Sequence, residues 1–137
     1  MTEPPREPVI RTTAMPADAN AYGDIFGGWL MSQMDIGAGL IAARFSRGRA
    51  VTVAMDGMQF HLPVKIGDEV SVYGALLGVG RSSMTIEVEA WRRHRHELEA
   101  VKVTEAVFTF VAVDEGGKSR RIERPDRTED EDSGGQL

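Results

Sequence analysis

One segment, residues 29–45, constrains the fold more than any other part of the chain. Its apolar residues point almost all round a helical wheel, which is typical of a buried helix. Asp35 lies in the middle of this segment, and a stripe of small or polar residues runs along one helix face through Gly28, Ser32, Asp35 and Gly39. Because an unpaired buried carboxylate is costly, we expect Asp35 to be either hydrogen-bonded or used in function. The stripe leaves room for a partner helix or a thin ligand.

The remaining pattern predicts an α+β domain. A strand is predicted at residues 8–15, and the helix is expected to stop near Gly48. After residue 50, apolar residues in β-type patterns predict four long antiparallel strands, at residues 50–62, 69–77, 84–96 and 100–113. The parity of the alternation reverses at residues 56–57, which predicts a β-bulge or a bend. We therefore expect a five-stranded sheet wrapped around one helix, with dimerisation covering the rest of that helix.

Length and composition narrow the class of protein. The 137 residues predict one domain, at residues 8–122, and the polar ends at residues 1–7 and 123–137 are predicted to be disordered. The chain has no cysteine, so disulfides and thiolate chemistry are excluded. Its start lacks the apolar core of a signal peptide, and polar residues interrupt the apolar helix, so we expect a cytoplasmic protein with no membrane partner. The net charge of −5 argues against nucleic acid as a partner.

A specific motif precedes and enters the helix. It comprises residues 15–18, 20–21 and 23–35, and further matching segments lie at residues 51–53, 67–68, 80–83, 104–108 and 111–114. Across roughly residues 9–122 this pattern resembles the hot-dog-fold acyl-CoA thioesterases of the bacterial YciA type. The resemblance implies the hot-dog fold, in which a curled antiparallel five-stranded sheet wraps one long central helix. That fold agrees with the strands and helix expected from the residues themselves.

The resemblance also implies the site. Asp35 would be the catalytic carboxylate, the thioester carbonyl would lie beside the backbone N–H groups near Gly28, and Asn20 of the partner subunit would be the companion of Asp35. The residues implied to bind coenzyme A are Thr52, Val53, Gly80, Arg81, Ser82 and Ser83. Acyl-CoA is the implied substrate, with coenzyme A as part of it, no separate cofactor and no metal. The implied assembly is a homodimer at minimum, commonly a trimer of dimers and hence a hexamer.

Elementary chemistry agrees with this site. Thioester hydrolysis needs an activated water or a nucleophile, and donors that stabilise the developing oxyanion. The N–H groups at a helix N-terminus are such donors. Asp35 lies seven residues beyond Gly28, which is about 10 Å of helical rise. Because that is too far for both to act on one carbonyl, we expect each site to combine Gly28 of one subunit with Asp35 of another.

Simpler interpretations of the same residues remain open. Asp35 could cap a neighbouring chain across a dimer, Asn20 could satisfy its own turn, and residues 81–83 could form an ordinary hairpin turn. The pair Gly27-Gly28 could serve tight packing alone. Tyr22 departs from the family pattern, because close members usually have a smaller polar residue there, so the resemblance implies nothing about acyl-chain preference.

Two other functions remain possible. One is a hot-dog hydratase or dehydratase acting on acyl thioesters, although the histidine and carboxylate pairing of such sites is not evident around Asp35. The other is a non-catalytic acyl-CoA-binding module. Three histidines without a cysteine do not make a credible metal site, and the chain has no G-x-S-x-G elbow, so a serine esterase mechanism is not expected.

Overall fold

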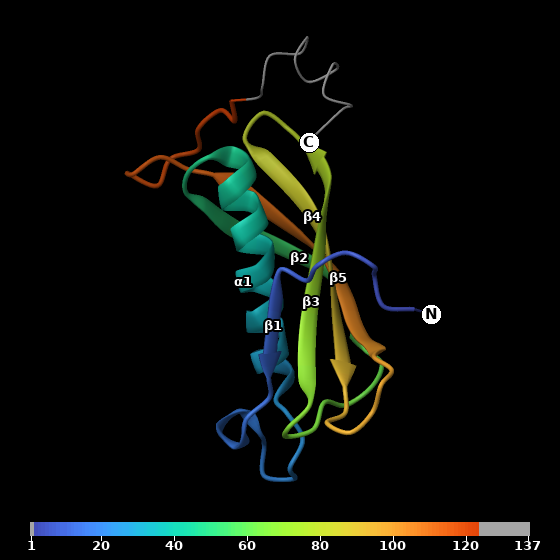
Figure 1. Ribbon diagram of the computed structural model, residues 1–137. Helices are drawn as coiled ribbons and strands as arrows, with labels where there is room; N and C mark the ends of the chain where they lie inside the picture. The colour runs from blue at the N-terminus through green and yellow to red at the C-terminus, as the bar shows by residue number, and fades with distance from the viewer. Residues whose placement is uncertain (1, 124–137) are drawn as a thin grey trace.

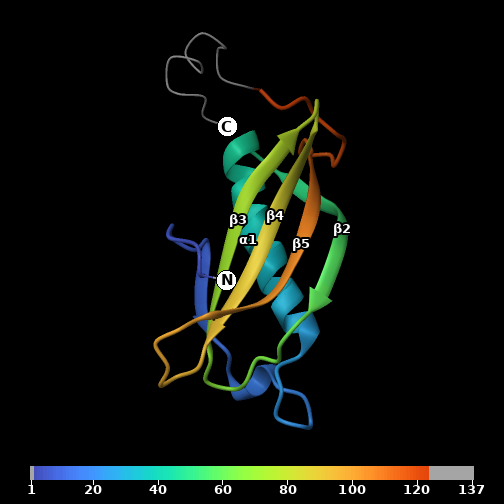
Figure 2. The ribbon, with the colours of Figure 1, turned by 90° about the vertical axis from the view of Figure 1, so that its right-hand side faces the viewer.

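One long helix packs against a curled antiparallel sheet in the computed structural model, which describes residues 2–123 (Figure 1). The strands are ordered β1-β3-β4-β5-β2 across the sheet. In chain order the elements are β1 (Ile10–Thr13), the 3₁₀ turn η1 (Pro16–Asp18), α1 (Gly27–Ser46), β2 (Ala50–Phe60), β3 (Glu69–Val79), β4 (Ser83–Arg93) and β5 (Val101–Ala112). The expected order of one strand, one long helix and four antiparallel strands is confirmed. Figure 2 shows α1 behind the sheet, with β2 at one edge.

The core lies between α1 and the sheet. Leu30, Met34, Ala38 and Ala42 recur at every fourth position, are almost fully buried and belong to one apolar cluster with the inward side chains of the strands. On another side of α1, Ile36 is 52% exposed and Leu40 is 42% exposed. A single chain therefore does not bury the helix on every side, as its sequence indicates. Within residues 2–123, no helix is long and apolar enough to cross a membrane.

The edge strand β2 is irregular where the sequence predicts it. Its pairing with β5 shifts register between Asp56 and Gln59, and Gly57 has a φ of 73°. This confirms the bulge predicted from the change of parity. A second shift lies between Thr52 and Ala54. These irregularities bend the strand so that it follows the curl of the sheet around α1.

The helix ends where the sequence predicts, but the residue with left-handed backbone angles at its end is an arginine and not a glycine. Arg47, with a φ of 56°, takes the left-handed conformation that a glycine was expected to supply, and its N–H reaches the carbonyl of Ala43. Gly48 instead makes room for Arg120, because a Cβ at Gly48 would lie 2.6 Å from Nη2 of Arg120. Arg120 donates to the carbonyl oxygens of Ser46 at 3.0 Å and Arg49 at 3.1 Å. Arg120 therefore fastens the end of α1 to the start of β2.

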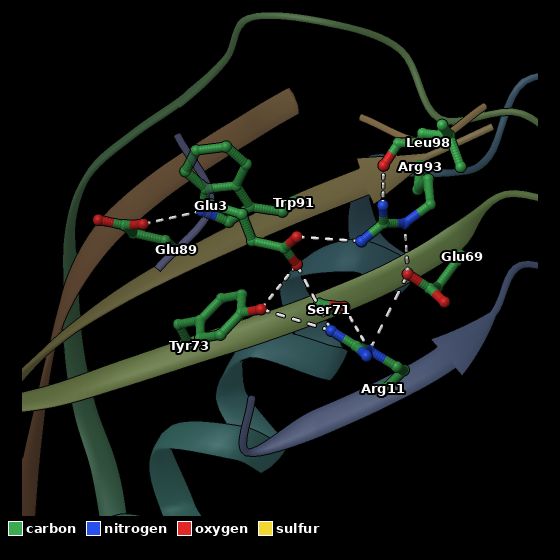
Figure 3. Close-up of polar contacts among 9 residues, drawn as sticks. All are labelled: Glu3, Arg11, Glu69, Ser71, Tyr73, Glu89, Trp91, Arg93 and Leu98. Atoms are coloured by element: carbon green, nitrogen blue, oxygen red, sulfur yellow. Dashed lines mark hydrogen bonds and ion pairs between the residues drawn. The ribbon is translucent and has the colours of Figure 1, made fainter. Parts of the chain in front are cut away.

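The two chain ends were both predicted to lack ordered structure. Residues 124–137 of the predicted acidic tail lie outside the described residues. In the N-terminal segment, the Glu3 carboxylate accepts a hydrogen bond from the Tyr73 hydroxyl at 2.6 Å and pairs with Arg93 at 3.1 Å and Arg11 at 3.4 Å (Figure 3). Tyr73 and Trp91 are each only 2% exposed, although neither belongs to the apolar cluster under α1. Glu3 thus joins β1, β3 and β4 by polar contacts.

The buried phenol of Tyr73 makes stability depend on alkaline pH. Burial, and then the hydrogen bond to Glu3, raises the pKa of Tyr73 above its ordinary value of 10.0. A raised folded-state pKa stabilises the protein below the ordinary value, and this stabilisation is lost as the pH rises above it. We expect the free energy of unfolding to fall above about pH 10, and Tyr73→Phe to remove part of that fall. At pH near 8 the same variant should lose about 1–2 kcal/mol, as the hydrogen bond to Glu3 is absent.

Denaturant unfolding near pH 8 measures the loss of the hydrogen bond to Glu3, and unfolding above about pH 10 measures the alkaline fall in stability. Tyr22→Phe is the matched control, because Tyr22 is 90% exposed and its side chain has no polar contact among the described residues. An alkaline loss of stability that is the same in Tyr73→Phe and in the parent chain would contradict the expectation.

Candidate functional site

Asp35 is held by a hydroxyl from β2. Thr52 Oγ1 donates to Asp35 Oδ1 at 2.5 Å, and the carboxylate is half-buried in the single chain. The sequence predicts a hydrogen bond or a functional role for Asp35 and assigns Thr52 to coenzyme A binding, but it does not bring the two together. Oδ2 of Asp35 has no partner within residues 2–123. The site therefore offers a fixed carboxylate with one free oxygen.

The first turn of α1 presents two free backbone donors. The N–H groups of Trp29 and Leu30 both reach the carbonyl of Phe26, at 3.1 and 3.3 Å. Those of Gly27 and Gly28 have no partner in the described part of the chain. A Cβ added at Gly28 would meet nothing within 4 Å, so the space beside Gly28 is open, whereas a Cβ added at Gly27 would lie 3.1 Å from Cζ of Phe60. This is the environment in which a developing negative charge is stabilised by a helix N-terminus.

The donors and the carboxylate lie apart on the same helix. Gly28 and Asp35 both lie within the unbroken helix α1, two turns from one another, so about 10 Å of rise separates them. One chain thus carries a fixed carboxylate and free backbone donors that are too far apart to contact the same small group. The expected combination of Gly28 from one subunit and Asp35 from another stays a prediction.

Asn20 lies in the loop that leads to α1. Its Oδ1 accepts the backbone N–H of Tyr22 at 2.8 Å and of Asp24 at 3.1 Å, so the side chain does stabilise its own turn. Its Nδ2 has no partner among residues 2–123 and remains a free donor. The turn orients this amide group, which is compatible with the predicted role beside Asp35 of a partner subunit.

The predicted coenzyme A turn, Gly80 to Ser83, is a hairpin turn between β3 and β4. The N–H of Gly80 reaches the carbonyl of Ser83 at 2.8 Å, and the carbonyl of Arg81 accepts the N–H of Ile122. The Arg81 side chain is exposed and without a partner in the described chain. Val53 is 56% exposed on β2, next to Thr52. Binding of coenzyme A at these residues stays a prediction.

Sequence reasoning named Arg81 but missed the other arginines around this turn. A cavity of about 760 Å³ is lined by Arg81 and Arg121, and one of about 650 Å³ by Arg121 together with Arg47 and Arg49. The turn, the end of α1 and the segment after β5 lie at the same end of the molecule (Figure 1). These arginines come from three separate segments, so the sequence does not show that they meet. Guanidinium groups suit a phosphate-bearing ligand. Acidic residues line the same cavities, however: Glu123 lines both, and Asp114 and Glu115 line the second, where Arg49 already donates to their carbonyls.

The chain is similar to known thioesterases in sequence. The family described as "Thioesterase superfamily" matches residues 22–99. An uncharacterized acyl-CoA thioester hydrolase of Zymomonas mobilis is 59% identical over 112 residues, which are 82% of this chain and 75% of that protein. The acyl-CoA thioester hydrolase YciA of Escherichia coli is 50% identical over 117 residues, which are 83% of this chain and 89% of that protein.

Solved structures agree in shape. The hexameric thioesterase of Yersinia pestis superposes with a TM-score of 0.85 and is 51% identical, covering 90% of this chain and 100% of that one. A hexameric hot-dog-fold thioesterase of Campylobacter jejuni gives a TM-score of 0.81 at 38% identity, covering 86% of this chain and 91% of that one.

Proposed function

Because the chain belongs to the thioesterase superfamily and has the hot-dog fold, we propose that it hydrolyses acyl-CoA thioesters to a free carboxylic acid and coenzyme A. The observation that carries this proposal is the Asp35 carboxylate on the central helix, which accepts a hydrogen bond from Thr52 on β2. The chain that contains it is 59% identical to an acyl-CoA thioester hydrolase. No separate cofactor and no metal take part in the proposed reaction.

Asp35 acts as a general base or as a nucleophile. Thr52 donates to Oδ1, which leaves Oδ2 to take a proton from water or to attack the thioester carbonyl. As a base, Asp35 directs the water oxygen to the carbonyl carbon, and the tetrahedral intermediate then expels the thiolate, which takes the proton from the Asp35 carboxyl group. As a nucleophile, it attacks the carbonyl carbon and displaces the coenzyme A thiolate, which leaves an acyl anhydride that water then hydrolyses to the free acid and the Asp35 carboxylate.

Oxyanion stabilisation falls to the free N–H groups of Gly27 and Gly28 and to the amide of Asn20. These groups come from the subunit opposite to the one that supplies Asp35 and Thr52, because about 10 Å separates Gly28 from Asp35 along one helix. The reacting carbonyl therefore lies between two chains, and the phosphates of coenzyme A extend towards the arginine-lined cavities.

The assembly is a homo-oligomer built on a dimer. The long edge strand β2 has no sheet neighbour on its outer side within the described chain, and Val51 and Val53 on it are 40% and 56% exposed. Ile36 and Leu40 on α1 are exposed as well. An exposed apolar edge strand of this length is a pairing surface. A trimer of such dimers is proposed from the hexameric state of the solved relatives.

A small panel of acyl-CoA compounds tests the function. We expect free thiol to appear with saturated acyl-CoA substrates, at an unchanged rate in the presence of a metal chelator. Loss of the enoyl chromophore from an unsaturated acyl-CoA without thiol release would indicate a hydratase. Binding without either change would indicate an acyl-CoA-binding module.

A further inference from the structure

Asp68 is a buried carboxylate that the proposed reaction does not use. Its side chain is 4% exposed, and both of its oxygens have partners. Oδ2 accepts the backbone N–H of Lys65 at 2.9 Å, and Oδ1 lies 2.8 Å from Nδ1 of His94. Nη1 of Arg92 lies 2.6 Å from Nε2 of His94. Because arginine can only donate, Nε2 accepts from Arg92 and Nδ1 donates to Asp68. With both oxygens engaged, Asp68 holds other groups in place.

These contacts anchor the turn at residues 63–68 to the sheet. Arg92, near the end of β4, donates from Nε to the carbonyl of Pro63 at 2.8 Å. At the other end of the turn, the backbone N–H of Asp68 reaches the carbonyl of Lys65 at 3.0 Å, and the chain then enters β3 directly. The backbone of the turn is therefore held to both β3 and β4.

The loop between β1 and α1 is attached to this turn at both of its ends. At its start, the N–H of Ala14 donates to the carbonyl of Asp68 at 2.9 Å, and the carbonyl of Ala14 accepts the N–H of Gly67 at 2.8 Å. At its end, the N–H of Ile25 donates to the carbonyl of Val64 at 2.9 Å. Loop and turn lie together at the end of the molecule where α1 begins (Figure 2). The turn thus determines where the loop sits.

Asp24 links the turn to Asn20, which lies in this loop. The Asp24 carboxylate accepts a hydrogen bond from Nζ of Lys65 at 2.5 Å, and the two residues also form an antiparallel backbone bridge. The backbone of Asp24 holds Asn20 at two points. Its carbonyl accepts the N–H of Asn20 at 2.7 Å, and its N–H donates to Oδ1 of Asn20 at 3.1 Å. A continuous run of contacts therefore leads from Asp68 to the amide group of Asn20.

We propose that Asp68 is a positioning residue for the hydrolysis, which orients the amide of Asn20 by fixing Lys65. Asp24 is the link between Lys65 and Asn20. The inference rests on the proposed thioesterase function, in which the amide of Asn20 helps to stabilise the oxyanion. A donor does so only from a narrow range of positions, and a misplacement of about 1 Å can lower a rate by about 10²-fold. Asp68 itself touches no substrate.

The test compares Asp68→Ala in two backgrounds. In the parent chain, kcat for thiol release should fall by about 10- to 100-fold and KM should change by no more than about twofold, because the Asn20 amide binds most strongly as the oxyanion forms. Asn20→Ala alone should lower kcat by about 10²-fold or more. Added to Asn20→Ala, Asp68→Ala should have no further effect on kcat, because there is no amide left to position. Circular dichroism and light scattering check that each variant keeps the parental fold and assembly.

Glu69→Gln is the matched control for the loss of a carboxylate. Glu69 directly follows Asp68, and its side chain pairs with Arg93 at 3.1 Å and with Arg11 at 3.9 Å. In the described part of the chain it makes no side-chain hydrogen bond or ion pair with the turn or with the Asn20 loop. Glu69→Gln should therefore keep the kcat and the KM of the parent chain.

Lys65→Met repeats the test without disturbing a buried group. The Lys65 side chain is 53% exposed, so its replacement should leave folding intact even if Asp68→Ala does not fold. The variant removes only the ion pair with Asp24. We expect kcat to fall by up to about fivefold, and only in chains that contain Asn20.

The outcomes separate the two proposals. If the parent chain releases thiol but Asp68→Ala and Lys65→Met keep the parental kcat, the positioning role is wrong and the thioesterase function stands. Equal losses with and without Asn20, which a merely structural role would give, would also overturn the inference, as would an unchanged kcat in Asn20→Ala. If the parent chain hydrolyses no acyl-CoA, the proposed function fails and this inference fails with it. Losses confined to chains that contain Asn20 support the inference.

Discussion

Replacing Asp35 with asparagine should abolish turnover while leaving the fold and coenzyme A binding intact. Asparagine keeps the shape of the side chain and can still accept the hydrogen bond of Thr52, but it is neither a base nor a nucleophile. Loss of a general base typically lowers the rate by about 10²–10⁴. We expect a fall in kcat of at least that size, measured by thiol release, with a circular dichroism spectrum like that of the parent chain.

A graded comparison strengthens this test. Thr52→Val removes only the donor that fixes the Asp35 carboxylate, so kcat should fall by about 10- to 100-fold, the worth of one hydrogen bond to a charged group. Glu87→Gln is the matched control for loss of a negative charge, because Glu87 is exposed on β4 and its side chain makes no hydrogen bond or ion pair in the described chain, although its charge acts on Lys102 through space. Near-normal turnover in Asp35→Asn would contradict the assignment of the catalytic carboxylate.

The same residue can be used to separate the two chemical routes. In a single turnover in ¹⁸O-labelled water, hydrolysis of an anhydride leaves the label in the Asp35 carboxylate when water attacks the aspartyl carbon. General-base catalysis places the label only in the released acid. Mass spectrometry of the peptide that contains Asp35 reads the difference.

A charged residue on the exposed side of α1 should separate the subunits and remove activity with them. Leu40 is 42% exposed in the single chain and lies on the helix side that the sheet does not cover. In Leu40→Asp, a carboxylate would have to be buried in the dimer, which is strongly unfavourable. We expect a smaller species in light scattering, and a fall in kcat/KM of about 10² or more, since each site loses donors of the other subunit.

Leu98→Asp is the control for this change, because Leu98 is 90% exposed in the loop between β4 and β5. It should keep both the assembly and the activity of the parent chain. Full activity in a Leu40→Asp variant that is shown to be monomeric would contradict the shared site and would place all the catalytic groups in one chain.

The architecture could be predicted because local patterns determine it. The apolar run of α1 and the alternation in the strands are properties of neighbouring residues, and the parity change at Asp56-Gly57 marks a bulge that the structure contains. The start of α1 could also be predicted from the sequence, because Gly27 and Gly28 directly precede the apolar run.

The contact between Thr52 and Asp35 could not be predicted in the same way. The two residues are 17 positions apart, and their meeting depends on the register of β2 at a bulge that starts at Thr52. Asn20 shows the opposite case, because its turn is local and the hydrogen bonds to Tyr22 and Asp24 follow from the composition of the loop.

Contacts between distant segments account for the rest. The arginines at the end of α1 and near the β3–β4 turn gather only in the folded chain. Glu3 lies in a polar, proline-rich segment whose composition predicts disorder, yet its carboxylate meets side chains from three strands. Composition indicates only whether a segment would be ordered in isolation. Glu3 is held by side chains from other segments, which composition does not reveal.

The hold of Arg120 on the end of α1 determines where a shortened version of this chain can stop. A truncation directly after β5 would leave the carbonyls of Ser46 and Arg49 without their donor and would uncover the space beside Gly48. Ile122, 4% exposed and bonded to Arg81, closes the same end. The shortest version of the chain that keeps these contacts therefore extends through Ile122. A fusion partner joined before Arg120 would remove the hydrogen bonds that hold the end of α1.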